Sequence, residues 1–155
     1  MHVTCREATA ADLDAIERIE HACFPDEPWS RASLAQELVR PGGIAWVALA
    51  DGIVAGFALG VMGGDVLDVW QVAVDPARQR AGVGRRLVDA LHAAAVAPGR
   101  CERASRAVLE VRVDNGAAIA MYVACGYRDV RVRRRYYADG CDARVMERTL
   151  SSQPQ

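Results

Sequence analysis

The sequence contains no lysine, and all 19 of its basic residues are arginine. A Walker A phosphate loop, a Schiff-base enzyme and a lysine general base each need that residue, so the sequence excludes all three. The arginines are balanced by 20 acidic residues, and the net charge is -1. With no bulk positive field, we expect no direct binding of nucleic acid and no attraction to an anionic membrane.

Long apolar segments are missing as well. The uncharged stretches at 41–50 and 52–64 fall short of the roughly 20 apolar residues that a membrane-spanning helix needs. The opening residues, MHVTCRE, contain no apolar core of a signal peptide. We therefore expect a protein that neither spans nor crosses a membrane.

Patterns for metal binding and hydrolase chemistry are absent too. The five cysteines form no CxxC pair, so neither a zinc site nor a redox pair is indicated, and unpaired thiols fit the cytoplasm. Three histidines (His2, His21 and His92) form no spaced cluster, and we expect them at the surface. The missing G-x-S-x-G motif leaves a serine-hydrolase triad unsupported. We expect no bound metal.

The remaining composition is that of one ordinary globular domain. The 155 residues are 52% hydrophobic and 25% charged, which argues against disorder. A chain of this length buries roughly 70% of its unfolded surface, which is enough for a core without disulfides. The sequence has no internal repeat and no linker. We expect one domain over residues 1–150, a disordered tail at 151–155 and a monomer.

Hydrophobic periodicity and turn residues predict alternating strands and helices. Strands are expected at 3–6, 44–50, 53–62, 66–74, 107–113, 127–135 and 143–150. Helices are expected from Thr9 or Asp12 to Cys23 and at 31–40, 84–96 and 116–125. The pair Asp51-Gly52 between two β-prone runs indicates a hairpin. This order predicts one α/β (α+β) domain, with a mixed, mostly antiparallel sheet of about seven strands flanked by about four helices.

The most informative segment connects the strand at 66–74 to the helix at 84–96. Glycines 82 and 84 lie in this turn, and four arginines surround it: Arg78, Arg80, Arg85 and Arg86. A strand that leads through such a turn into a helix directs free backbone N–H groups and the positive helix end at one point. A phosphate or pyrophosphate would fit there, although a plain helix start with solvated arginines is an equal alternative. Leu87 stands where a Rossmann fingerprint needs its third glycine.

Several motifs resemble those of the GCN5-related N-acetyltransferases (GNAT). Gln79-x-x-Gly82-x-Gly84, after a strand that ends in VAVDP, is similar to the acetyl-CoA motif of that superfamily. LEVR at 109–112, followed by Asn115, AAIA, Tyr122 and a GY pair, resembles the RimI type, the ribosomal-protein-alanine N-acetyltransferases. RRYY at 134–137 and the segment FP…PWS at 24–30 are also similar. The resemblance extends from about residue 4 to residue 150 and implies a single GNAT-type domain.

The resemblance implies acetyl transfer from acetyl-CoA to the α-amine of a protein N-terminus, with the N-terminal alanine of a small-subunit ribosomal protein as the acceptor. It assigns the CoA pyrophosphate to the amides of the turn, namely Arg80, Ala81, Gly82, Val83, Gly84 and Arg85. It implies that the strand Val72, Ala73 and Val74 pairs with the pantetheine arm and polarises the thioester carbonyl. It also makes Asn115 a CoA contact, although Asn before a helix is equally a good N-cap.

Glu110 and Tyr122 are the candidate catalytic pair. Attack of an amine on a thioester needs a base for the amine, a donor for the oxyanion and a proton for the leaving thiolate. Strand alternation places Glu110 with Arg112 on one face, and the residues alone favour a solvent-exposed charged pair. The resemblance instead implies that Glu110 is the base, acting through a water. It implies that Tyr122, otherwise a core tyrosine with its hydroxyl at the rim, is the acid.

Aromatic residues mark the acceptor side. The resemblance implies that Phe24, Trp29, Tyr136 and Tyr137 flank the groove for the protein N-terminus, although Phe24 and Trp29 could equally staple two helices together. The arginine-rich segment 97–106 could touch the adenosine phosphate of CoA or form a solvated loop. Two other functions stay open: a small-molecule amine acetyltransferase of the same fold, and a catalytically silent acyl-CoA-binding module.

Overall fold

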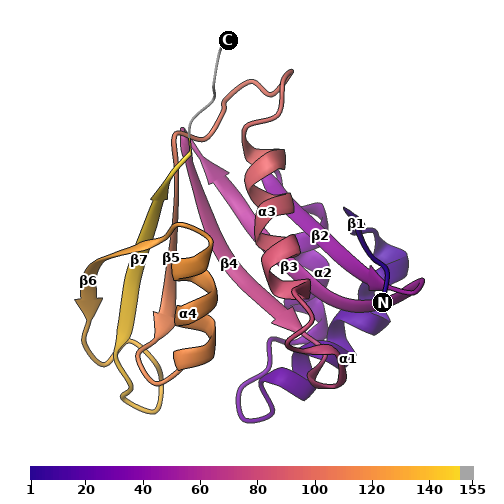
Figure 1. Cartoon of the computed structure of the whole chain (residues 1–155), viewed down its shortest axis with the longest axis horizontal. Helices are drawn as coiled ribbons and strands as arrows, with labels where there is room; N and C mark the ends of the chain where they lie inside the picture. Colours follow the sequence, from indigo (N-terminus) through magenta and orange to yellow (C-terminus); the bar gives the residue numbers. More distant parts are fainter. Residues whose placement is uncertain (151–155) are drawn as a thin grey trace.

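The computed structural model describes residues 1–150, and the tail expected at 151–155 lies outside the described residues. Within 1–150 the chain forms seven strands and four α-helices in the predicted order (Figure 1). The strands are β1 (Val3–Glu7), β2 (Gly43–Ala50), β3 (Ile53–Gly63), β4 (Val66–Val74), β5 (Arg106–Arg112), β6 (Arg128–Arg133) and β7 (Ala143–Thr149). The helices are α1 (Leu13–Cys23), α2 (Arg31–Val39), α3 (Val83–Ala95) and α4 (Gly116–Ala124).

Local chemistry explains where these elements begin and turn. Asp51 and Gly52 have φ values of 50° and 85°, the left-handed conformations that a tight two-residue hairpin between β2 and β3 requires. Ser30 caps α2 by accepting a hydrogen bond from the Ser33 amide at 3.1 Å. A short 3-10 turn, Ala10–Asp12, precedes α1. The predicted strands and helices are therefore confirmed, with ends that differ by at most two residues.

The seven strands form one sheet in the order β1-β2-β3-β4-β5-β7-β6. Helices α3 and α4 cover one face and α1 and α2 the other, as Figure 1 shows. Each face has its own apolar cluster: Leu87 and Leu91 are buried on the α3 side, and Ile16, Ile19 and Phe57 on the α1 side. The sheet is thus buried by helices on both faces, mainly over strands β2 to β4.

Among residues 1–150, β4 and β5 form the one parallel pair of strands, and they separate after a few residues. They pair only between 66–69 and 106–109, and beyond that β4 continues along β3 while β5 continues along β7. Figure 1 shows the two strands diverging. The carboxyl half of β4 therefore has no strand partner on its β5 side among residues 1–150, and its backbone groups there can bind another extended chain.

A β-bulge in β4 changes which face its side chains occupy. Leu59 of β3 pairs with Gln71 and Gly60 pairs with Val69, so Trp70 is the additional residue. Val69 and Val72 both pack in the α3 cluster, whereas Gln71 bonds to a side chain of α1. The bulge therefore turns two consecutive residues, Trp70 and Gln71, toward the α1 and α2 side of the sheet.

Candidate active site

The glycine turn forms an open helix N-terminus. Gly82 is the N-cap of α3 with φ 79°, and Arg80 just before it also has a positive φ of 66°. The amide of Arg86 bonds to the Gly82 carbonyl at 3.2 Å, so the amides of 83–85 precede the first helical hydrogen bond. A Cβ on Gly82 would meet no described atom within 4 Å. The turn thus offers free amides and open space to an anion.

Gly84 has a different function from Gly82. A Cβ on Gly84 would lie 2.7 Å from the sulfur of Met121 on α4, closer than real Cβ contacts come. Gly84 therefore allows α3 and α4 to approach each other. The motif Gly82-x-Gly84 combines an open helix end with a close helix contact, and the sequence alone did not separate these two roles.

The free edge of β4 is offered mainly by Val72. The amide of Asp75 bonds to Ala55 of β3 at 2.8 Å, and strand alternation then directs the Ala73 backbone toward β3 and that of Val72 and Val74 outward. The Val74 carbonyl already accepts hydrogen bonds from a thiol and from an amide side chain. An added chain would therefore bind to both backbone groups of Val72 and to the Val74 amide.

Glu110 lies on β5 with its side chain 27% exposed. Its neighbours Leu109 and Val111 are buried on the opposite face, as the alternation predicts. A guanidinium nitrogen of Arg133 lies 3.3 Å from its carboxylate. Glu110 also lines a cavity of about 270 Å³ on the side of the sheet where β5, β6 and β7 carry no helix. The carboxylate is thus accessible to a small polar group or a water.

Tyr122 of α4 is 8% exposed, with its ring edge-on to Tyr127 at a centroid distance of 5.6 Å. Burial, with a smaller contribution from Cys125 and Tyr137, raises the pKa of Tyr122. No hydrogen bond to its hydroxyl is formed by the residues from 1 to 150. The hydroxyl therefore stays protonated at neutral pH and is free to donate.

Tyr136 and Tyr137 lie near Glu110, because the Arg133 guanidinium that lies 3.3 Å from the Glu110 carboxylate also lies 5.3 Å from the centroid of the Tyr136 ring. Burial raises the pKa of Tyr137 to about 12; Tyr136 and the Glu110 carboxylate raise it by smaller amounts, and Arg112 opposes them. Tyr137 in turn contributes to the raised pKa of Tyr122. The structure therefore brings one residue of the predicted acceptor side into the neighbourhood of Glu110 and Tyr122.

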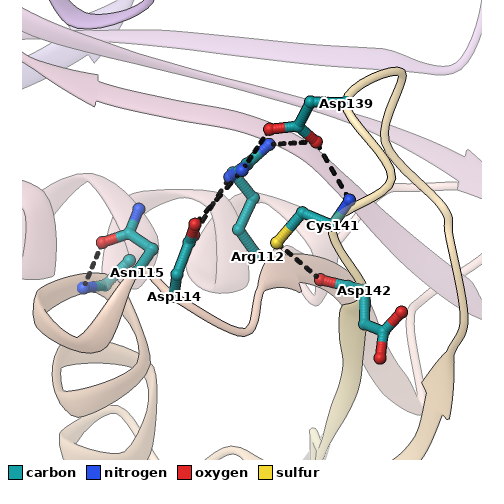
Figure 2. A network of polar contacts seen from close by, with 7 residues as sticks. Arg112, Asp114, Asn115, Asp139, Cys141 and Asp142 are labelled. Atoms are coloured by element: carbon teal, nitrogen blue, oxygen red, sulfur yellow. Dashed lines mark hydrogen bonds and ion pairs between the residues drawn. The ribbon is translucent and has the colours of Figure 1, made fainter.

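Arg112 fixes the loop that carries Tyr137. As Figure 2 shows, its guanidinium bonds to Asp114 at the end of β5 and to Asp139 in the connection between β6 and β7, at 3.0 and 2.7 Å. These bonds lower the pKa of both carboxylates. The guanidinium carbon also lies 4.9 Å from the centroid of the Tyr137 ring.

Asn115, also drawn in Figure 2, accepts a hydrogen bond from the Ala118 amide at 3.1 Å, which confirms it as the N-cap of α4.

The segment 24–30, which we call the 24–30 loop, lies against β4. Phe24 and Trp29 both pack on the α1-side cluster, as expected for a staple. The Trp29 ring also meets that of Trp70 edge-on at a centroid distance of 6.2 Å. Glu20 of α1, which is fully buried, accepts hydrogen bonds from the Trp29 amide and the Gln71 side chain. Burial raises the pKa of Glu20.

Glu20 was not predicted from the sequence. It follows Ile16 and precedes Cys23 at helical spacing, so an acidic residue within that apolar stripe was the available signal.

The prediction that His92 lies at the surface is wrong, because the residue is 6% exposed on the inward stripe of α3. Its Nε2 lies 2.7 Å from the Tyr127 hydroxyl, and Arg148 donates to its Nδ1 at 3.1 Å.

The described residues also bear on metal binding, on membrane crossing and on the segment 97–106. Residues 1–150 hold no group of three His, Cys, Asp or Glu side chains arranged for a metal ion, and the expected lack of a metal stays a prediction. None of the helices in this range combines the length and hydropathy needed to cross a bilayer. The segment 97–106 leads into β5, and Ser105 just before that strand bonds to Asp65. A contact of this segment with CoA stays a prediction.

Comparison with known proteins gives consistent matches. Residues 13–127 match the Acetyltransferase (GNAT) family. The chain is 37% identical over 152 residues to N-alpha-acetyltransferase RimI of Mycobacterium tuberculosis, covering 94% of this chain and 92% of that protein. It is 32% identical over 153 residues to the ribosomal protein bS18-alanine N-acetyltransferase of Escherichia coli, covering 96% and 98%. The crystal structure of the Escherichia coli ribosomal-protein-S18-alanine N-acetyltransferase superimposes with a TM-score of 0.83 and 30% identity, covering 99% and 97%.

Proposed function

The chain belongs to the acetyltransferase (GNAT) family, and from that premise we propose that it transfers the acetyl group of acetyl-CoA to the N-terminal α-amine of a protein. The observation that carries the proposal is the divergence of β4 from β5, which leaves an unpaired strand edge between the glycine turn and Glu110. An extended thioester substrate can pair with that edge, with its phosphates at the turn. The names of the relatives in Mycobacterium tuberculosis and Escherichia coli support an α-amine acceptor.

The turn residues Arg80–Arg85 hold the pyrophosphate through backbone amides, and Val72 with Val74 holds the pantetheine arm. Ala73 is the least suited of the predicted strand contacts, since its backbone groups face β3. Asn115 serves as a CoA contact in addition to its cap. A strand amide, preorganised by the sheet, stabilises the oxyanion that forms during attack.

The chemical step is direct attack of the neutral amine on the thioester carbonyl. A carbon–nitrogen bond forms and the carbon–sulfur bond breaks, with no covalent enzyme intermediate. An α-amine has a pKa of about 7.7–8.0, so only modest base assistance is needed. Glu110 accepts the amine proton through a water. Tyr122 donates to the leaving thiolate, a role that suits a buried hydroxyl that remains protonated.

The acceptor amine enters between the 24–30 loop and the loop that carries Tyr136 and Tyr137. Trp29 provides an aromatic wall on one side, and Tyr137 provides one beside Glu110. The name of the Escherichia coli relative favours an N-terminal alanine of a small-subunit ribosomal protein. We also propose that the protein is cytoplasmic and monomeric, needs no metal, and makes no direct contact with a membrane or with nucleic acid.

A peptide panel tests the acceptor. The protein is incubated with acetyl-CoA and peptides that differ only in their first residue, and products are located by mass spectrometry. We expect acetylation of the α-amine, with alanine among the preferred first residues. Acetylation of polyamines or aminoglycosides alone would replace the protein acceptor with a small molecule. Binding of acetyl-CoA without any acetyl transfer would identify a silent acyl-CoA-binding module.

A further inference from the structure

Glu20 is a buried carboxylate that the proposed chemistry does not use. Its exposure is 0%, the same as that of Ile16 and Ile19 on the same helix. It takes part in none of the ion pairs within residues 1–150. Burying a carboxylate without a cation is unfavourable, and a leucine would fill the same space at lower cost. Its presence therefore calls for a role other than stability.

The carboxylate joins two segments that are far apart in sequence. The Gln71 amide nitrogen donates to both Glu20 oxygens at 2.7 and 3.0 Å, across a separation of 51 residues. The Trp29 backbone amide donates to the second oxygen at 3.0 Å. Residues 25–29 make this one hydrogen bond to the rest of the described chain. Two of the five are prolines, which have no amide hydrogen to donate. Glu20 thus connects the 24–30 loop to β4.

The bulge in β4 makes this connection possible. Regular alternation would direct only one of Trp70 and Gln71 toward the loop, whereas the bulge directs both. Gln71 reaches Glu20, and Trp70 packs edge-on against Trp29. The guanidinium carbon of Arg40, at the C-cap of α2, lies 4.8 Å from the centroid of the Trp70 ring on the same side. One polar and one aromatic contact therefore hold the loop on the strand that carries the thioester.

We propose that the Glu20–Gln71 pair is a latch that holds the 24–30 loop on β4 and thereby positions the acceptor amine against the thioester. Glu20 is a positioning residue, because it acts through Trp29 and Gln71 and touches no reacting atom. The identity of the acceptor rests on the proposed function, whereas the anchoring of the loop does not. Loss of the latch should weaken acceptor use and leave acetyl-CoA binding intact, since misplacement of a bound group by about 1 Å can cost up to 10²-fold in rate.

The test compares the full-length protein with three variants. Glu20→Leu/Gln71→Leu replaces both side-chain partners with apolar groups, which preserves packing and leaves only the Trp29 amide without its hydrogen bond. Glu20→Gln is the conservative variant, because its amide can still accept from Trp29 and pair with a reoriented Gln71 amide. Glu17→Gln is the matched control, one turn earlier on α1, where a partly exposed carboxylate pairs with Arg31. If the leucine pair does not fold, Glu20→Met/Gln71→Met tests the same point with unbranched side chains.

Two measurements distinguish failure of the latch from failure of the proposed function. For the leucine pair we expect the peptide KM to rise about tenfold with an unchanged acetyl-CoA Kd, and cleavage by chymotrypsin after Trp29, followed by mass spectrometry, to become faster. Glu20→Gln and Glu17→Gln should stay near wild type in both. The cleavage rate needs no acceptor, so it tests the latch even if no peptide is acetylated.

Three outcomes would overturn the latch. In a folded leucine pair, wild-type cleavage and wild-type KM would show that Glu20 only fills space. A parallel loss of acetyl-CoA affinity would show that the pair supports β4 in general. Equal damage in Glu20→Gln would show that charge, and not the hydrogen bonds, is what matters.

Discussion

At the scale of single residues, Glu110 and Tyr122 lie in opposite surroundings. Glu110 is partly exposed beside Arg133, so a water or the acceptor amine can reach its carboxylate. Tyr122 is buried, and its raised pKa keeps the hydroxyl protonated. Environments that differ in this way are what separate a base from an acid in one active site.

Substitution at these two residues should give different pH responses. General acid–base groups contribute about 10²–10⁴-fold, so Glu110→Gln and Tyr122→Phe should each lose kcat within that range while keeping acetyl-CoA affinity. The α-amine is increasingly neutral near pH 8, so Glu110→Gln should recover activity as pH rises. Tyr122→Phe should not recover, because a higher pH does not replace a missing donor. Steady-state kinetics from pH 6 to 9 measure this, and wild-type kcat in both variants would leave positioning and the oxyanion contact as the whole mechanism.

At the scale of elements, the two glycines of the turn should separate binding from stability. Asp tolerates the left-handed conformation of Gly82 better than most residues do, so Gly82→Asp should fold with a modest loss of stability, but its carboxylate would occupy the place proposed for the pyrophosphate. We expect its acetyl-CoA Kd to rise at least about tenfold, with only the modest fall in Tm that a left-handed Asp causes. Gly84→Ala should lower stability by about 1–2 kcal/mol through its contact with Met121 and change Kd less. Calorimetry measures Kd and thermal unfolding measures Tm for both variants. Equal effects on Kd would show that the two glycines do not have separate roles.

The elements themselves were predictable because their signals are local. Asp51-Gly52 fixed the hairpin, Ser30 and Asn115 capped their helices, and the apolar stripe of α3 was evident. The bulge at Trp70 was not predictable, since neither Gly60 nor Trp70 marks it unambiguously. It depends on how β3 and β4 pair, which is a property of two strands together.

At the scale of the whole molecule, the missed features are pairings between distant segments. Glu20 and Gln71 are 51 residues apart, and His92 and Arg148 are 56 apart. Each member alone is an ordinary polar residue on a helix or strand, and only the fold brings the partners together. A single sequence carries the family motifs of the site, but it does not show which buried polar groups hold those motifs in place.

His92 of α3 bonds to Tyr127, directly before β6, and to Arg148 of β7, so its titration should affect the stability of the whole domain. Arginine can only donate, so Nδ1 of His92 accepts from Arg148 and Nε2 carries the proton toward Tyr127. Burial, and secondarily Arg148, lowers the pKa of His92 from 6.5 to about 4. Between these two values the unfolded chain binds a proton that the folded chain does not, so stability falls as pH falls through that window.

The expected loss of folding stability as the pH falls through this window is on the order of 3 kcal/mol, because each pKa unit corresponds to about 1.4 kcal/mol. Denaturant unfolding of the wild type and of His92→Gln from pH 7 to pH 4 measures it, and the titration of carboxylates common to both proteins cancels in the difference. The stability advantage of the wild type should shrink as the pH is lowered and level off near pH 4. The glutamine amide can still accept from Arg148 and donate to Tyr127, so it keeps the connection without the titrating group. An advantage that stays constant across this range would mean that His92 has the same pKa in the folded and unfolded chains.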